Sequence, residues 1–131
     1  MTFQDLGVTN NEANAETALH RAQIRQVQKA RKVRATFFGE DMFADPAWDM
    51  LLELYACQLS QQRVSISGAS AAAGVPPTTA LRWITVLEQK NFITRENDPL
   101  DGRRVWISLT SHGAFLMRRY FMATSIDPSG L

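Results

Sequence analysis

A change of hydrophobic repeat within residues 78–109 restricts the fold of this chain more than any other feature. The apolar side chains of residues 78–90 recur at the spacing of one helix face, at Ala80, Trp83, Ile84 and Leu87. Residues 92–96 and 105–109 then alternate apolar and polar side chains, as half-buried strands do. Asp-Pro and Asp-Gly pairs, which favour turns, lie between these strands. The segment therefore predicts a helix followed by a β-hairpin with a basic tip.

Two longer helices are expected before this segment. Residues 14–37 contain no Pro or Gly and are rich in Ala, Gln, Arg and Lys, which favours a helix. The apolar seam of this helix is loose, so we expect it to be exposed or packed against a partner. Asp45-Pro46 starts the next helix, because Asp45 can accept hydrogen bonds from the first turn and Pro46 has no N–H to lose there. Aromatic and leucine side chains at helical spacing continue this helix to Ser60.

A small helix is expected next. Residues 64–66 are β-prone, and Ser67 follows them as the N-cap of a helix over residues 68–73. Gly74 ends this helix. Gly, Ala and Ser make up the small helix, and such side chains bury little area but let a neighbouring helix approach closely.

Two polar residues mark element ends around the hairpin. Asn91 stands where a residue in the left-handed conformation would close the helix at 78–90. Thr110 is expected to cap a last helix over residues 111–122.

The order of these elements is that of a winged helix-turn-helix, a mainly α fold with a small β-hairpin wing and here an extra long N-terminal helix. Residues 46–113 resemble the DNA-binding core of the MarR-type transcriptional regulators. Four stretches carry the resemblance: Ala73-Gly74-Val75-Pro76 at the turn, residues 87–93, the wing residues 98–104, and Leu109-Thr110 with Gly113.

The chain divides accordingly into flexible tails at 1–13 and 124–131, an N-terminal helix at 14–38, and a winged-helix DNA-binding domain at 45–123. Members of the family dimerise through long helices. The resemblance therefore implies a homodimer with the helix at 14–38 in its interface.

The helix at 78–90 is expected to enter the major groove of double-stranded DNA. With its apolar face turned inward, five polar residues point outward: Thr78, Thr79, Arg82, Thr85 and Gln89. Arg82 can form two hydrogen bonds to a guanine edge, and Thr78 or Thr79 can contact a phosphate or a thymine methyl group. The alternative for these residues is a solvated helix face.

The wing at 97–104 is expected to reach the minor groove or the DNA backbone through Arg103 and Arg104. Alternate residues of a strand face opposite ways, so we expect one of the two to point at DNA, and Arg103 matches the family position. Asp101 is expected to orient a neighbouring arginine or the turn backbone. The alternative is a solvated hairpin tip.

The net charge of +1 conceals four blocks of charge. Residues 1–20 sum to −3, 21–34 to +6, 35–60 to −5 and 61–131 to +3. The second block contains a stripe of cations at helical spacing, Arg21, Arg25, Lys29 and Lys32. This basic stripe can be a solvated face, can contact the DNA backbone, or can pair with the acidic block at 40–53 of its own chain or of a partner chain.

Several function classes are disfavoured. Cys57 is the single cysteine, shares a helix face with Met50 and Leu54, and is expected to be buried rather than redox-active. His20 and His112 lack partners at metal-ligand spacing, and the chain has no catalytic triad, phosphate loop or cofactor motif. No membrane span or secretory signal is expected, so the cytoplasm is the default compartment.

These observations predict a sequence-specific DNA-binding transcriptional regulator that is not an enzyme and reads a pseudo-palindromic site as a homodimer. Whether a small-molecule effector binds is left open. The alternative is a winged-helix module for protein–protein interaction, because the net charge is near neutral and Leu81 and Val86 are apolar positions within the recognition helix. A surface patch of Leu81, Val86 and Leu100 without adjacent positive charge would favour that alternative.

Overall fold

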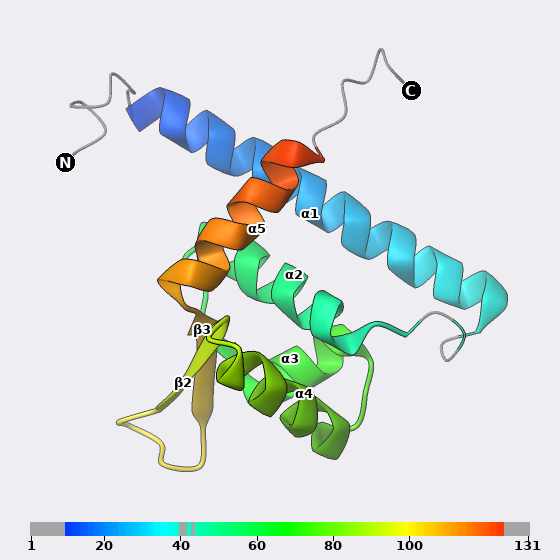
Figure 1. Cartoon of the computed structure of the whole chain (residues 1–131), viewed down its shortest axis with the longest axis vertical. Coiled ribbons are helices and arrows are strands. Elements are labelled where there is room, and N and C mark those ends of the chain that lie inside the picture. Colours follow the sequence, from blue (N-terminus) through cyan, green and yellow to red (C-terminus); the bar gives the residue numbers. More distant parts are fainter. Residues whose placement is uncertain (1–9, 40–41, 43, 125–131) are drawn as a thin grey trace.

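Helices dominate the part of the chain that the structure, a computed structural model, describes, which is residues 10–39, 42 and 44–124 (Figure 1). In chain order the elements are α1 (Asn10–Phe38), α2 (Pro46–Leu59), β1 (Val64–Ser65), α3 (Ile66–Ala73), α4 (Pro77–Gln89), β2 (Ile93–Asn97), β3 (Val105–Leu109) and α5 (Ser111–Ala123). The strands form one antiparallel sheet in the order β1-β3-β2. The prediction of a mainly helical winged helix-turn-helix with a long N-terminal helix is confirmed, and β1 adds a third strand to the hairpin.

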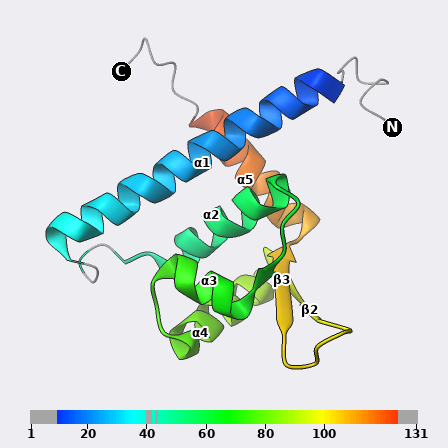
Figure 2. The same cartoon turned by 180° about the vertical axis from the view of Figure 1, so that it is seen from behind.

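The long helix α1 lies on one side of the molecule, and α4 and the wing lie on the opposite side (Figures 1 and 2). Ile24 is fully buried and anchors α1 against α2. An ion pair of 3.1 Å between Glu16 and Arg118 joins α1 to α5, which crosses it. None of the described helices is both long and apolar enough to cross a membrane.

The helix α2 forms the centre of the core. It packs against α1, α3, α4, β3 and α5. Its buried residues are Met50, Leu52, Leu54, Tyr55, Ala56 and Cys57. Fully burying a Leu or Met side chain contributes about 1.5–3 kcal/mol to stability, so α2 holds α1, α3, α4 and the sheet on a common support.

The ends of α1 and α2 follow local chemistry. Asp45 caps α2 as predicted, since its carboxylate accepts a hydrogen bond from the Trp48 N–H at 3.4 Å. The helix α1 begins at Asn10, four residues before the predicted start at Asn14. The rest of the predicted N-terminal tail, and the tail from residue 125, lie outside the described residues.

The predicted N-cap of the small helix was wrong. Ser65, and not Ser67, caps α3, and its hydroxyl accepts a hydrogen bond from the Gly68 N–H at 3.1 Å. The helix therefore starts at Ile66, which the sequence analysis assigned to the strand. Only Val64 and Ser65 pair with β3, and the extended backbone of Ser65 serves both the strand and the cap.

The start of α5 is seated against the turn between α4 and β2. Asn91 closes α4 with a φ of 63°, as predicted. The Thr110 hydroxyl donates to the Asn91 carbonyl at 2.7 Å and accepts from the Gly113 N–H at 2.9 Å. A Cβ atom at Gly113 would lie 2.1 Å from the Phe92 carbonyl oxygen. Only glycine allows this approach, which explains the glycine in the Leu109-Thr110-x-x-Gly113 motif.

Replacing Gly113 with Ala should lower the free energy of unfolding by about 3 kcal/mol, because the added methyl group must displace backbone atoms. Gly102→Ala is the matched control: no described atom lies within 4 Å of its added Cβ, and we expect a change within about 0.5 kcal/mol. Urea unfolding followed by circular dichroism measures both. Equal stability of the two variants would contradict the close contact.

Candidate nucleic-acid interface

The turn between α3 and α4 sets the direction of α4. Gly74 is in the left-handed conformation, with a φ of 65°, and ends α3 as predicted. The buried Ser70 hydroxyl donates to the Val75 carbonyl at 2.7 Å. Pro77 then occupies the first helical position of α4, where its missing N–H costs no hydrogen bond. Backbone conformation and one buried hydroxyl therefore aim α4 without a side-chain N-cap.

The two faces of α4 differ as predicted. The inward residues are buried at Ala80, Ile84 and Leu87 and half-buried at Trp83. On the opposite face Thr78, Arg82 and Gln89 are exposed and Thr79 is half-buried. Arg82 is the one cation within α4, and it has no carboxylate partner among the described residues.

Thr85 makes internal contacts instead of pointing freely outward. Its hydroxyl donates to the Leu81 carbonyl at 2.9 Å and accepts from Nη2 of Arg95 at 2.7 Å. Arg95 also pairs with Glu88 through Nε at 3.2 Å. The Thr85 hydroxyl is thus already engaged within the chain.

Arg95 contributes to the site although it is not among the residues predicted from the sequence. It belongs to β2 and ties this strand of the wing to α4 through Thr85 and Glu88. Strand alternation puts Arg95 on the same face as the buried Ile93. An arginine at an inward strand position needs partners, and that signal was available in the sequence.

The tip of the wing is held by two aspartates. Asp98 accepts from the Leu100 N–H at 2.8 Å. Asp101 accepts from the backbone N–H of Arg103 at 3.1 Å and from its Nε at 3.3 Å. The backbone hydrogen bond from Arg103, followed by its side-chain bond, lowers the pKa of Asp101. The prediction that Asp101 orients a neighbouring arginine is confirmed, and 93% of the Arg103 side chain is exposed.

Arg104 is held differently, by an aromatic ring. Its guanidinium carbon lies 5.1 Å from the ring centroid of Trp106 on β3. Arg63, in the loop before β1, lies 5.6 Å from the same centroid. Both distances are within the range of cation–π contacts, about 6 Å.

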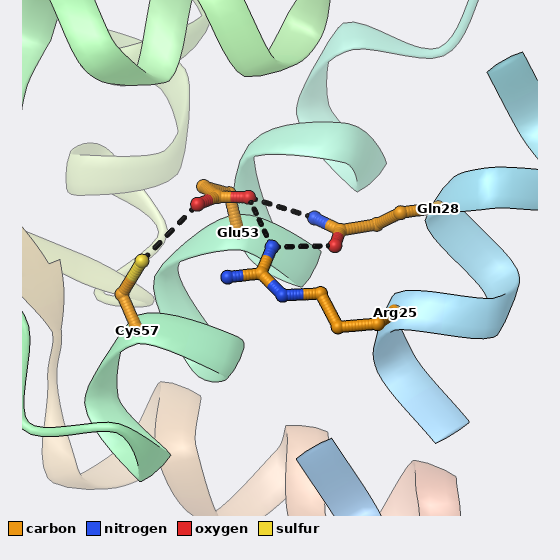
Figure 3. A network of polar contacts seen from close by, with 4 residues as sticks. All are labelled: Arg25, Gln28, Glu53 and Cys57. Carbon is orange, nitrogen blue, oxygen red and sulfur yellow. Dashed lines mark hydrogen bonds and ion pairs between the residues drawn. The ribbon is translucent and has the colours of Figure 1, made fainter. Parts of the chain in front are cut away.

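Glu53 on α2 gathers three polar groups around its carboxylate (Figure 3). Arg25 pairs with Oε2 at 2.9 Å, and Gln28 donates to the same oxygen at 2.8 Å. The Cys57 thiol donates to Oε1 at 3.1 Å. Burial raises the pKa of Glu53, but the hydrogen bonds from Cys57, Gln28 and Arg25 outweigh burial and the pKa is lowered. Glu53 is therefore an ionised link between α1 and α2.

The basic stripe of α1 is thus partly paired within its own chain. Arg25 pairs with the acidic block through Glu53, and the neighbouring Arg31 pairs with Asp49. The other members, Arg21, Lys29 and Lys32, are exposed and form no ion pair with described residues. The first acids of the block, Glu40 and Asp41, lie outside the described residues. A DNA-backbone contact by the unpaired cations stays a prediction.

A cleft of about 510 Å³ opens between α1, α2 and the α3–α4 turn. Lys32, Asp49 and residues 71–76 are among those that line it. The cleft therefore lies between α1 and the segment that sets the direction of α4.

The histidines take part in packing. His20 is buried, with Nδ1 lying 3.5 Å from the Tyr55 hydroxyl. His112 stacks on the Phe92 ring at 5.9 Å. Within residues 10–39, 42 and 44–124, no three His, Cys, Asp or Glu side chains gather in a way that could hold a metal ion.

The apolar patch that would favour a protein-interaction module has cations beside it. Leu100 is 95% exposed and Leu81 38%, whereas Val86 is half-buried. Exposed Arg82 follows Leu81 in α4, and exposed Arg103 lies at the same wing tip as Leu100. The condition of no adjacent positive charge is therefore not met.

Solved structures share this arrangement of helices and wing. The S. aureus MepR–DNA complex matches with a TM-score of 0.57 and 24% identity over 79% of this chain and 81% of that one. A mutant MepR from a multidrug-resistant S. aureus clinical isolate matches with a TM-score of 0.56 and 23% identity over 84% and 76%. An Archaeoglobus fulgidus protein matches with a TM-score of 0.55 and 21% identity over 70% and 93%.

These similarities confirm the winged-helix fold, and at this level of identity they concern the fold alone. MepR belongs to the MarR family, so the resemblance inferred from the sequence is confirmed for the fold. No family model and no curated protein matches the sequence.

The structure predicts a slow reaction of Cys57. Burial is the largest cause that raises the pKa of this thiol, to about 11 from 9.0, and the neighbouring carboxylate of Glu53 adds to it. At pH 8 the thiolate fraction is then about 100-fold lower than in the unfolded chain, and the higher nucleophilicity of the thiolate offsets only part of this, so labelling by a disulfide reagent should be slower by about 10-fold or more. Stopped-flow labelling of native and urea-unfolded protein measures the ratio. Similar rates in both states would point to an accessible, activated thiol.

Proposed function

We propose that this protein is a transcriptional regulator of the MarR type that binds double-stranded DNA as a homodimer. The observation that carries the proposal is the outward face of α4. Arg82 is exposed there without a carboxylate partner among the described residues, and the wing presents the exposed Arg103. The fold supports the same function, because MepR has been solved in complex with DNA.

The helix α4 reads bases in the major groove. Arg82 lies in its second turn and forms two hydrogen bonds with a guanine edge. Thr78 and Thr79 lie in its first turn, where free N–H groups and the helix dipole favour a phosphate. Gln89 lies in the last turn and contacts the edge of the same site.

The wing adds contacts that depend less on sequence. Arg103 reaches the minor groove or its phosphates, and Asp101 limits the directions that its side chain can take. Arg104 contacts the backbone beside the wing. These contacts position the protein on the duplex, whereas Arg82 selects the bases.

The dimer interface is formed by α1 and α5. Leu19 lies one turn from Glu16 on α1, and Phe115 and Met122 lie one turn from Arg118 on α5. These three apolar side chains therefore lie on the helix faces that carry the Glu16–Arg118 ion pair, and they are 58%, 55% and 54% exposed, respectively. A second copy of the chain covers them and places two recognition helices about one DNA turn apart, as a pseudo-palindromic site requires.

Arg82→Ala should weaken binding to the preferred site by about 1–3 kcal/mol and relax base selection there. Arg103→Ala should weaken binding to all DNA sequences by more similar amounts, because Arg103 contacts the backbone or the minor groove. Fluorescence anisotropy with the preferred site and with a scrambled duplex measures both effects. If both variants bind like the parent protein, the assignment of the site is wrong.

A double variant, Leu19→Glu with Phe115→Glu, should be monomeric at concentrations where the parent is a dimer, because four carboxylates would then face one another in an apolar interface. Leu100→Glu, at an exposed wing position, should leave the dimer intact. Sedimentation velocity gives the mass of each. A dimer that tolerates the double variant would place the interface elsewhere.

A further inference from the structure

We infer that Arg63, Trp106 and Arg104 form a phosphate-binding site that extends the DNA interface to the backbone flanking the base pairs read by α4. The inference rests on the proposed DNA-binding function and adds Arg63 and Trp106 to it.

The site brings together three separate segments of the chain. Arg63 precedes β1, Arg104 ends the wing turn, and Trp106 belongs to β3, the central strand of the sheet. The two guanidinium carbons lie 5.6 and 5.1 Å from one ring centroid, so two like charges are gathered around a single indole. Repulsion between them makes an anion a favourable third partner.

Neither of these two cations forms a close ion pair with a described carboxylate, although the charge of Arg104 contributes to the lowered pKa of Asp101. Five other arginines, Arg25, Arg31, Arg95, Arg103 and Arg118, each pair with a carboxylate, whereas Arg21 and Arg82 do not pair with one among the described residues. Among the described residues no carboxylate pairs with Arg63 or Arg104, and both side chains are exposed. A guanidinium group over an aromatic ring keeps its N–H edge free, and that edge matches the oxygens of a phosphate. The indole thus orders the two arginines while leaving their charge available.

The position of the site follows from the register of the sheet. Arg95 faces α4, since it bonds Thr85 and Glu88. The next residue, Glu96, points to the opposite face and is paired with Trp106. Trp106 therefore lies on the face of the sheet that is turned away from α4. A phosphate bound there belongs to the backbone beside the wing and not to the groove that α4 occupies.

Two duplexes test the inference. Both carry the same site, selected from a random-sequence pool; the short one ends with the site, and the long one adds about one helical turn on each side. Arg63→Gln should weaken binding to the long duplex about tenfold and to the short duplex less than twofold. On the long duplex the slope of log affinity against log salt should fall by about 0.9 for each lost phosphate contact, or about 1.8 for a dimer.

Four matched variants sharpen the result. Arg63→Lys keeps the charge and should keep most of the salt slope. Trp106→Leu keeps both charges but removes the ring. It should lose part of the affinity for the long duplex that Arg63→Gln loses, with little change in the salt slope. Glu96→Gln removes a carboxylate from this face and should strengthen binding to the long duplex about twofold. Arg119→Gln is the control for Arg63→Gln, because it also removes one positive charge and one cation–π contact, here to the Phe115 ring at 5.7 Å. It should leave the difference in affinity between the long and short duplexes unchanged.

Each outcome has one meaning. Suppose that the parent protein binds the short duplex. If Arg63→Gln then binds both duplexes like the parent, or loses the same affinity for both, the flanking site is overturned and the proposed function stands. If the parent protein binds neither duplex above its affinity for scrambled DNA, the proposed function fails and the flanking site fails with it.

Discussion

Burial of the inner face of α4 is the constraint on which the proposed interface depends. Ile84 is fully buried and Leu87 is 4% exposed, and each contributes about 1.5–3 kcal/mol by leaving water. Because that face is held against the core, the orientation of α4 about its own axis is fixed, and in this orientation Arg82 points outward. Arg95 then links β2 to α4 through Thr85 and Glu88, so α4 and the wing are held together.

Most of the arginines that pair with carboxylates inside the chain differ from those proposed to bind DNA; Arg103, which pairs with Asp101, is the exception. The basic block on α1 pairs in part with acids on α2, through Glu53 and Asp49. Arg82 on α4, and Arg63 and Arg104 beside Trp106, form no ion pair with described residues. A net charge of +1 is therefore compatible with a basic face, and it implies weak general affinity for polyanions with binding that depends on shape and site.

Local chemistry made the elements and most of their ends predictable. Asp45, Asn91 and Thr110 act at their helix ends as their side chains suggest. Ser65 and Ser67 both suit a cap, and only the short pairing of β1 with β3 decides between them. Within the site, the helical repeat alone placed Arg82. The strand pattern shows that Arg95 needs a partner, but which residue bonds it, and the approach of Arg63 to Trp106, depend on how separate segments pack.

Selection of bound duplexes from a random-sequence pool, with the mass of the selected complex measured alongside, tests the central claim most directly. We expect a two-fold symmetric motif with half-sites about one helical turn apart, occupied by two copies of the chain. A pool that stays unenriched, with no stable complex of protein and DNA, would contradict the assignment of α4 and the wing as a DNA-reading surface.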